Sequence, residues 1–248
     1  MPNRYVAKLA AENERVLFGA SIHPYRLDWR DELAFCLENR AVLCKWIPSS
    51  QLIDPLNQHC DEFYDKLAEH NLPLLYHAGP EYAIPTSNHE YDEFNNPKYL
   101  KTILDKGVTV IIAHCTMPFW GDLDIEYQDD FTEFLKLFEE AESKDWKLYA
   151  DLSAICSPLR NKYVQIIKAR LAEITPKRLI YASDYPIPLS ELCYQKSTNF
   201  FAWLIYVFNV ARTKNYLDKN YLLIKGMDFK EKICSNAPEL FSMINYGF

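Results

Sequence analysis

The stretches LPLLYH (residues 72–77) and VTVIIAH (residues 108–114) decide the fold, because each is a nearly continuous apolar run that ends in a histidine. Runs of this length and composition are typical of short strands in a parallel sheet that is covered on both faces. The carboxyl ends of parallel strands meet at one edge of the sheet. The two stretches therefore predict that His77 and His114 lie close together.

Two further apolar runs carry a polar residue at or near the end. Lys45 is the next-to-last residue of AVLCKW (residues 41–46), and Asp184 ends RLIYASD (residues 178–184). If these runs are strands of the same sheet, the lysine and the aspartate join the two histidines at one edge. Two imidazoles, a carboxylate and a lysine in one place predict metal-assisted chemistry.

The rest of the chain alternates strand-like and helix-like segments. The predicted strands cover residues 16–22, 41–47, 73–76, 108–113, 147–152 and 178–182. Helical spacing of apolar residues covers residues 28–39, 56–70, 97–106, 130–144 and 159–173. Repeated βα units form either an open doubly wound sheet or a closed (β/α) barrel. The six glycines form no phosphate-binding fingerprint, which argues against a nucleotide-binding open sheet.

Length and charge narrow the class of protein. The chain of 248 residues is 49% hydrophobic, and residues 1–248 are predicted to form a single domain. Its formal net charge of −7 is spread without a basic stripe, which argues against nucleic acids and anionic membranes as partners. A small-molecule substrate is the expected partner.

The cysteines and the longest apolar stretch bear on the cellular environment. The seven cysteines are an odd number without a C-x-x-C pair, which predicts reduced thiols and a cytoplasmic protein. The apolar stretch at residues 200–210 is too short to cross a bilayer, and we expect it to be a buried helix.

Each candidate residue also has a structural interpretation. A lone histidine after an apolar run usually makes structural hydrogen bonds, but two at equivalent positions of successive βα units favour a shared metal ion. Asp184 could cap a turn, or it could bind the metal and accept the proton of the attacking water. Lys45 could reach solvent or pair with a carboxylate, or it could orient a substrate carbonyl or carboxylate.

Other residues near the predicted strand ends receive secondary roles. We expect His23 and Asp151 to be structural and to bond the backbone of loops at the mouth of the site. Long loops leave the same edge, and loops of this kind commonly build a substrate pocket. The aromatic residues that could line such a pocket for a planar ligand are Tyr82, Phe119, Trp120 and Tyr185.

In their ordered combination these motifs give the chain a family resemblance. It resembles the amidohydrolase-related family (amidohydrolase 2) of metal-dependent hydrolases, which also includes aromatic-acid decarboxylases. The resemblance runs from about Val16 to Phe241. The passages that carry it are the stretch from Cys44 to Gly79, VTVIIAHC (108–115), LYADLSA (148–154), RLIYASDYP (178–186) and SNAPELF (235–241).

The resemblance implies a (β/α)8 TIM barrel with a divalent ion, usually zinc, at its carboxyl-terminal mouth. His77 is similar to the family's metal-binding histidine of the fifth strand. His114 is similar to the sixth-strand histidine, which binds metal or assists catalysis in different branches, and Asp184 to the eighth-strand aspartate. Lys45 is similar to the fourth-strand lysine. The implied metal ligands are therefore His77, His114 and Asp184, and the implied catalytic residues are Asp184, His114 and Lys45.

The sequence departs from the family pattern at its start. Family members begin with an H-x-H motif on strand one, and no H-x-H occurs in these 248 residues. If residues 16–22 correspond to strand three, the barrel has about six βα units and lacks strands one and two. The chain would then be a piece of a longer enzyme, a protein whose missing strands come from another subunit, or a degenerate member. The uncovered strip of core also predicts a possible homo-oligomer.

Taken together, the sequence predicts a metal-dependent hydrolase. A water activated by the metal would attack a carbonyl of a small cyclic or aromatic substrate, while Asp184 handles the proton, His114 stabilises developing charge and Lys45 positions the substrate. Decarboxylation on the same scaffold is the alternative reaction. An inactive fragment or a non-catalytic binding protein is the alternative from a different class.

Overall fold

Six short parallel strands organise the molecule. The computed structural model describes residues 2–81, 84, 89–117, 125–160, 164–191, 200–227, 229 and 231–247. The strands are β1 (Phe18–Ala20), β2 (Ala41–Trp46), β3 (Leu74–His77), β4 (Val110–Ala113), β5 (Leu148–Asp151) and β6 (Leu179–Ile180). Within the described residues they form one six-stranded sheet in sequence order, and every neighbouring pair is parallel. The predicted α/β class and the incomplete barrel of six strands are confirmed.

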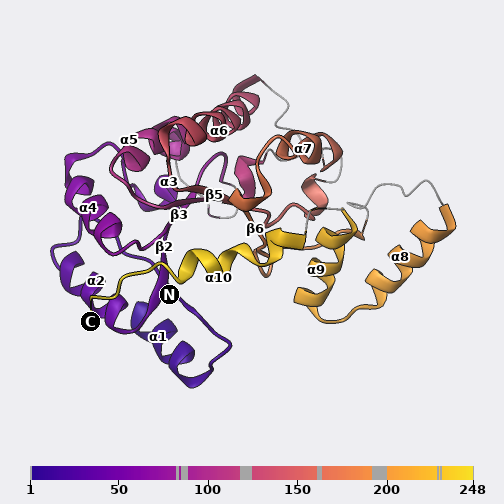
Figure 1. Cartoon of the computed structure of the whole chain (residues 1–248), viewed down its shortest axis with the longest axis horizontal. Coiled ribbons are helices and arrows are strands. Elements are labelled where there is room, and N and C mark those ends of the chain that lie inside the picture. Colours follow the sequence, from indigo (N-terminus) through magenta and orange to yellow (C-terminus); the bar gives the residue numbers. More distant parts are fainter. Residues whose placement is uncertain are drawn as a thin grey trace.

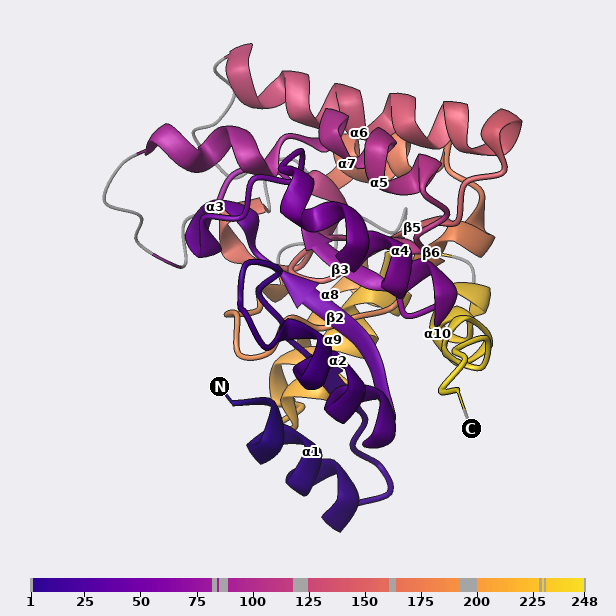
Figure 2. The same cartoon turned by 90° about the vertical axis from the view of Figure 1, so that its left-hand side faces the viewer.

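Helices follow the strands and cover the sheet (Figures 1 and 2). Their bounds are α1 (Asn3–Glu12), α2 (Trp29–Glu38), α3 (Pro48–Gln51), α4 (Asp61–Glu69), α5 (Leu100–Asp105), α6 (Ile125–Lys144), α7 (Val164–Leu171), α8 (Phe200–Arg212), α9 (Tyr216–Gly226) and α10 (Asn236–Phe241). The sequence predicted α2, α4, α5, α6 and α7 with different bounds. It did not predict α1, α3, α9 and α10.

The observed bounds of a helix differ from the predicted ones where a side chain caps the backbone at another position. A helix was expected from residue 56, but α4 begins at Asp61 because the Asn57 side chain accepts a hydrogen bond from His59 N and caps a separate 3-10 turn. Such a cap satisfies a backbone donor that the helix start would otherwise leave unpaired.

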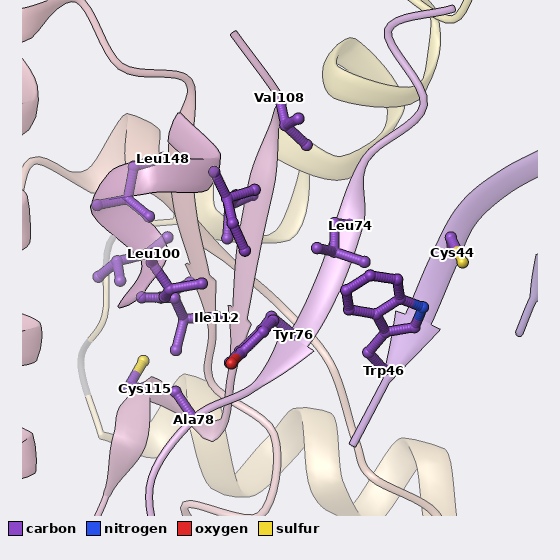
Figure 3. Packing of buried hydrophobic residues seen from close by; sticks show 14 of the residues in the cluster. Cys44, Trp46, Leu74, Tyr76, Ala78, Leu100, Val108, Ile112, Cys115 and Leu148 are labelled. Carbon is purple, nitrogen blue, oxygen red and sulfur yellow. The ribbon is translucent and has the colours of Figure 1, made fainter. Parts of the chain in front are cut away.

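One face of the sheet packs against the helices. Trp46, Tyr76 and Ile112 are successive register partners of β2, β3 and β4, so their side chains share this face. All three are fully buried, and Trp46 stacks on Phe63 of α4 with ring centroids 5.3 Å apart. Leu100, at the start of α5, packs with Ile112 in the same layer (Figure 3). This cover explains why the strands are apolar at nearly every position.

The opposite face corresponds to the interior of a barrel, and α10 covers part of it. Leu75, Ile111 and Tyr149 are register partners on this face, in line with Lys45. Leu240 of α10 joins Ile111 in a small apolar cluster that also includes Leu75 and Tyr149. The layer below the strand ends is therefore filled by a helix.

Hydrogen bonds attach α10 to the last strand. The side-chain amide of Asn236 donates to the carbonyl oxygens of Pro176 and Leu179, each at 2.7 Å. Beyond α10, the backbone of Asn245 contacts His70, and the Asn245 N–H donates to His70 O at 2.7 Å. The C-terminal segment thus joins the last strand of the sheet to the end of α4.

The expectation of a buried helix at residues 200–210 is wrong in one respect. The segment is helical, as α8, but Phe201, Ile205 and Phe208 are 75%, 63% and 59% exposed. Figure 1 shows α8 beside α9 in a hairpin that projects from the sheet, and none of the described residues forms a second layer over its outer face. Within the described part of the chain, no helix is long and apolar enough to cross a membrane.

The exposure of α8 predicts that replacing one of its phenylalanines by alanine lowers the stability less than replacing a buried phenylalanine does. Phe134 of α6 is 0% exposed and Phe208 of α8 is 59% exposed. We expect Phe134→Ala to lower the free energy of unfolding by about 3–5 kcal/mol and Phe208→Ala by less than ~1 kcal/mol. Urea unfolding of the two variants measures both values. Equal losses would contradict the exposed position of α8.

Candidate functional site

The polar residues predicted from the strand ends meet at one edge of the sheet. Lys45 is the next-to-last residue of β2, His77 ends β3, and His114 directly follows β4. Asp151 ends β5, and Asp184 lies four residues beyond the end of β6. Because all these strands are parallel, the five residues share the carboxyl edge.

His77 is buried and electrically neutral. Its Nε2 lies 3.2 Å from Pro80 O and 3.5 Å from a carboxylate oxygen of Glu81. A carbonyl oxygen only accepts, so the contact with Pro80 requires a proton on Nε2. Burial, reinforced by the positive charge of Lys45, lowers the pKa of His77 to about 3. The ring is therefore uncharged at neutral pH.

A left-handed turn directs the His114 side chain. His114, Cys115 and Thr116 have φ values of 59°, 50° and 50°, a conformation that costs energy for residues with a Cβ. Asp151 supports this turn, because its Oδ1 accepts from His114 N at 2.9 Å and its backbone oxygen accepts from Cys115 Sγ at 3.0 Å. The strain is thus held in place from the neighbouring strand.

The His114 ring lies between three polar partners. Its Nδ1 is 2.6 Å from Ser153 Oγ and 3.7 Å from Asp184 Oδ2, and its ring centroid is 5.3 Å from that of His77. Burial, followed by the interactions with His77 and with the charged Lys45, holds the pKa of His114 well below its ordinary value. Both imidazoles are therefore neutral, which is the protonation state that a metal ligand requires.

Lys45 and Asp184 form the charged part of the site. Burial lowers the pKa of Lys45 to about 8, although the carboxylates of Asp151, Asp184 and Glu81 act in the opposite direction. Burial and then the charge of Asp151 raise the pKa of Asp184, while Lys45 lowers it. Asp184 also has a positive φ of 56°. The surroundings of Lys45 and Asp184 thus shift the pKa of each group toward neutral pH, as is typical of functional sites.

Sequence reasoning missed three residues of this site. Glu81 follows His77 by four residues, Ser153 follows Asp151 by two, and Arg160 stands in the stretch SPLR. Arg160 is 2% exposed and donates from Nη2 to Met117 O at 3.1 Å, and its charge lowers the pKa of both histidines. The proximity of Glu81 and Ser153 to a strand end was the available signal, but nothing marked Arg160 as buried.

The predicted secondary roles can be compared with their contacts. His23 Nε2 lies 2.9 Å from Gln51 O, and Asp151 accepts backbone N–H groups of two loops, as expected for residues that bond loop backbone. Tyr185 is 68% exposed and packs edge to face against Tyr216, with centroids 4.9 Å apart. The other predicted pocket aromatics, Tyr82, Phe119 and Trp120, lie outside the described residues.

The donor chemistry suits a divalent metal, although the donors are not gathered around one point. His114 lies near His77 and near Asp184, as the distances above give. Among the residues that the structure describes, however, no three His, Cys, Asp or Glu side chains are placed to hold one ion. Neutral imidazoles and carboxylates are the ligands that zinc and similar ions take in proteins. The assignment of His77, His114 and Asp184 as ligands stays a prediction.

Comparisons with known proteins agree with the fold. A family model described as "Amidohydrolase" matches residues 1–236. The TIM-barrel protein Bb4693 from Bordetella bronchiseptica has a TM-score of 0.59 at 15% identity, with 98% of this chain and 73% of that chain covered. A protein from Lactobacillus casei, provisionally described as a metal-dependent hydrolase, has a TM-score of 0.46 at 15% identity, with 97% and 64% covered.

A third solved structure, described as amidohydrolase II, has a TM-score of 0.48 at 14% identity, with 97% and 75% covered. The chain thus spans about two thirds to three quarters of the length of these structures. Among curated proteins, none matches the sequence significantly.

The depressed pKa of His77 predicts a stability loss in acid. The folded protein binds a proton at His77 only near pH 3, whereas the unfolded chain binds it near 6.5. The contribution of His77 is therefore complete above about pH 6.5 and decreases as the pH falls toward 3. We expect His77→Gln to flatten the dependence of unfolding free energy on pH in this window by up to ~1.4 kcal/mol per pH unit, the value for one proton.

Urea unfolding at intervals between pH 4 and 7 measures this slope. His59→Gln is the matched control, because the His59 side chain is exposed and lies outside the site. An unchanged slope in His77→Gln would mean that His77 is not buried in its neutral form.

Proposed function

Since the amidohydrolase model matches residues 1–236, the chain belongs to the amidohydrolase family, and on that premise we propose that it acts as a metal-dependent hydrolase on a small cyclic or aromatic substrate. The observation that carries the proposal is the cluster at the carboxyl edge. There two neutral imidazoles, the buried His77 and the half-buried His114, stand beside Asp184 and Lys45. A structural role alone gives no reason for so many ionisable groups in one partly buried place.

In this proposal His77, His114 and Asp184 are the residues that would hold a divalent ion, with zinc as the expected metal. When bound there, such an ion supplies Lewis acidity, which polarises a carbonyl and makes a water more acidic. Burial supports binding by keeping the imidazole lone pairs available at neutral pH, since a protonated imidazole cannot ligate a metal.

Asp184 is proposed to handle the proton of the attacking water. The pKa of its carboxyl group is raised toward neutral pH, and a group whose pKa lies nearer the working pH transfers protons efficiently in both directions. Its side chain remains partly accessible, at 35% exposure, so a water or substrate can reach it. Asp151, by contrast, is 5% exposed and occupied by loop N–H groups, which makes it a poor candidate for this task.

Lys45 is proposed to position the substrate. With a pKa of about 8 it keeps most of its charge at pH 7, and it lies under the influence of Asp151, Asp184 and Glu81. An ammonium group in this setting can bind a carbonyl or carboxylate oxygen of a substrate. Neighbouring aromatics support a planar substrate, because Tyr185 packs on Tyr216. Burial and then the charge of Asp184 raise the pKa of Tyr216, which places this tyrosine near the site.

The first test combines metal analysis with two assays. The purified protein is loaded with Zn²⁺ or Mn²⁺, its metal content is measured, and it is assayed against cyclic amides and lactones for hydrolysis and aromatic carboxylic acids for release of CO2. We expect about one metal ion per chain and turnover in the hydrolysis assay. We expect His77→Ala to reduce the metal content, and Asp184→Asn to lower kcat about 10²- to 10⁴-fold, as for loss of a general acid or base.

His59→Gln again serves as the control and should retain full activity. Release of CO2 without hydrolysis would replace the proposal with the decarboxylase alternative. A protein that binds no metal and turns over neither class of substrate would instead be a non-catalytic binding protein or an inactive fragment.

A further inference from the structure

Three side chains of the site form a chain of hydrogen bonds. Asp151 Oδ1 accepts from the Ser153 hydroxyl and from Ser153 N, the latter at 3.0 Å, in addition to His114 N. Ser153 Oγ lies in turn 2.6 Å from His114 Nδ1. Asp151 and Ser153 are 5% and 3% exposed, so these contacts are made away from bulk water. The chain therefore runs from a buried carboxylate through a hydroxyl to an imidazole.

The direction of the hydrogen bonds follows from counting protons. A serine hydroxyl carries a single hydrogen, and the carboxylate oxygen of Asp151 can only accept it. Once that hydrogen points at Asp151, Ser153 Oγ has only lone pairs to offer to His114. A contact of 2.6 Å between two lone pairs would be repulsive, so His114 Nδ1 must carry a proton and donate it.

The competing acceptor for this proton is too distant. Asp184 Oδ2 lies 3.7 Å from His114 Nδ1, beyond hydrogen-bond distance. A neutral imidazole has one proton, so a proton on Nδ1 leaves Nε2 with a free lone pair. His77 differs, because it donates from Nε2 to Pro80 O. The two histidines of the site therefore have opposite tautomers.

We propose that Ser153, itself oriented by Asp151, is a positioning residue that fixes His114 in the Nδ1–H tautomer and leaves Nε2 as a lone-pair donor. The tautomer is a property of the folded chain, whereas its role rests on the proposed function. It distinguishes two tasks for His114: a neutral ring with a bare Nε2 can bind a metal or accept a proton there, but it cannot donate a hydrogen bond to developing negative charge from that atom.

The tautomer can be measured without an activity assay. In protein labelled with ¹⁵N-histidine and free of metal, two-bond ¹H–¹⁵N correlation spectra at pH 7.5 identify which ring nitrogen of each histidine bears the proton. The signals of His114 are assigned by their loss in His114→Gln. We expect Nδ1–H for His114 and Nε2–H for His77.

The effect of Ser153 is tested by substitution. We expect Ser153→Ala to lower the ratio of Nδ1–H to Nε2–H in His114 by about tenfold, as loss of a hydrogen bond of ordinary strength would do. Ser153→Thr keeps the hydroxyl and should restore the ratio. Ser157→Ala removes another buried serine, at 3% exposure, and should leave the His114 signals unchanged.

Two results would overturn the proposal. One is Nε2–H for His114 in the wild type, which needs no variant and therefore holds even if Ser153→Ala fails to fold. The other is an unchanged ratio in a folded Ser153→Ala protein. An Nδ1–H tautomer in a protein without hydrolase activity would support the positioning role while rejecting the proposed function, so the two failures are distinguishable.

Discussion

The parallel register from β2 to β5 is the constraint on which the rest of the structure depends. It places Lys45, Leu75, Ile111 and Tyr149 side by side on one face, and Trp46, Tyr76, Ile112 and Ala150 on the other. Because side chains alternate along a strand, a slip of one residue would turn the apolar layer outward and move Lys45 to the helix-covered face. The same register aligns the ends of β3, β4 and β5. The packing of the core and the assembly of the site therefore have one cause.

Burial controls the chemistry of the site more than ion pairing does. Desolvation is the largest influence on the pKa of Lys45, His77, His114 and Asp184, and in each case it disfavours the charged form. Neighbouring charges then adjust the balance: the three carboxylates favour the lysine ammonium, while Lys45 and Arg160 disfavour protonated imidazoles. The result is a site with neutral histidines between oppositely charged groups. Asp151 stabilises this arrangement twice, because its carboxylate holds the strained turn at His114 and orients Ser153.

The interior of the incomplete barrel is covered by the end of the chain. A sheet of six strands leaves an inner face that a closed barrel of eight would fill with side chains of its own. Here Leu240 of α10 packs against Ile111 and Ile180, and Asn236 binds the backbone before and at the start of β6. The cover reaches the layer below the strand ends and leaves the residues above it available for the site. By contrast, the outer face of α8 has no such cover in the described residues.

The sequence by itself determined the strands, the βα alternation and the residues at the strand ends, because these follow from local apolar runs and from the geometry of parallel strands. Lys45, His77, His114 and Asp184 were identified in this way, with the family to which they belong. Tertiary structure alone decided the burial of Arg160, the exposure of α8, and the contacts of Ser153 and Glu81. These depend on which segments meet across the fold, and helical periodicity does not state whether an apolar helix finds a partner. Tertiary structure also decided the tautomer of His114, since the proton on the imidazole is placed by the hydrogen bond that it donates to Ser153, which follows β5, and not by the residues beside it in sequence.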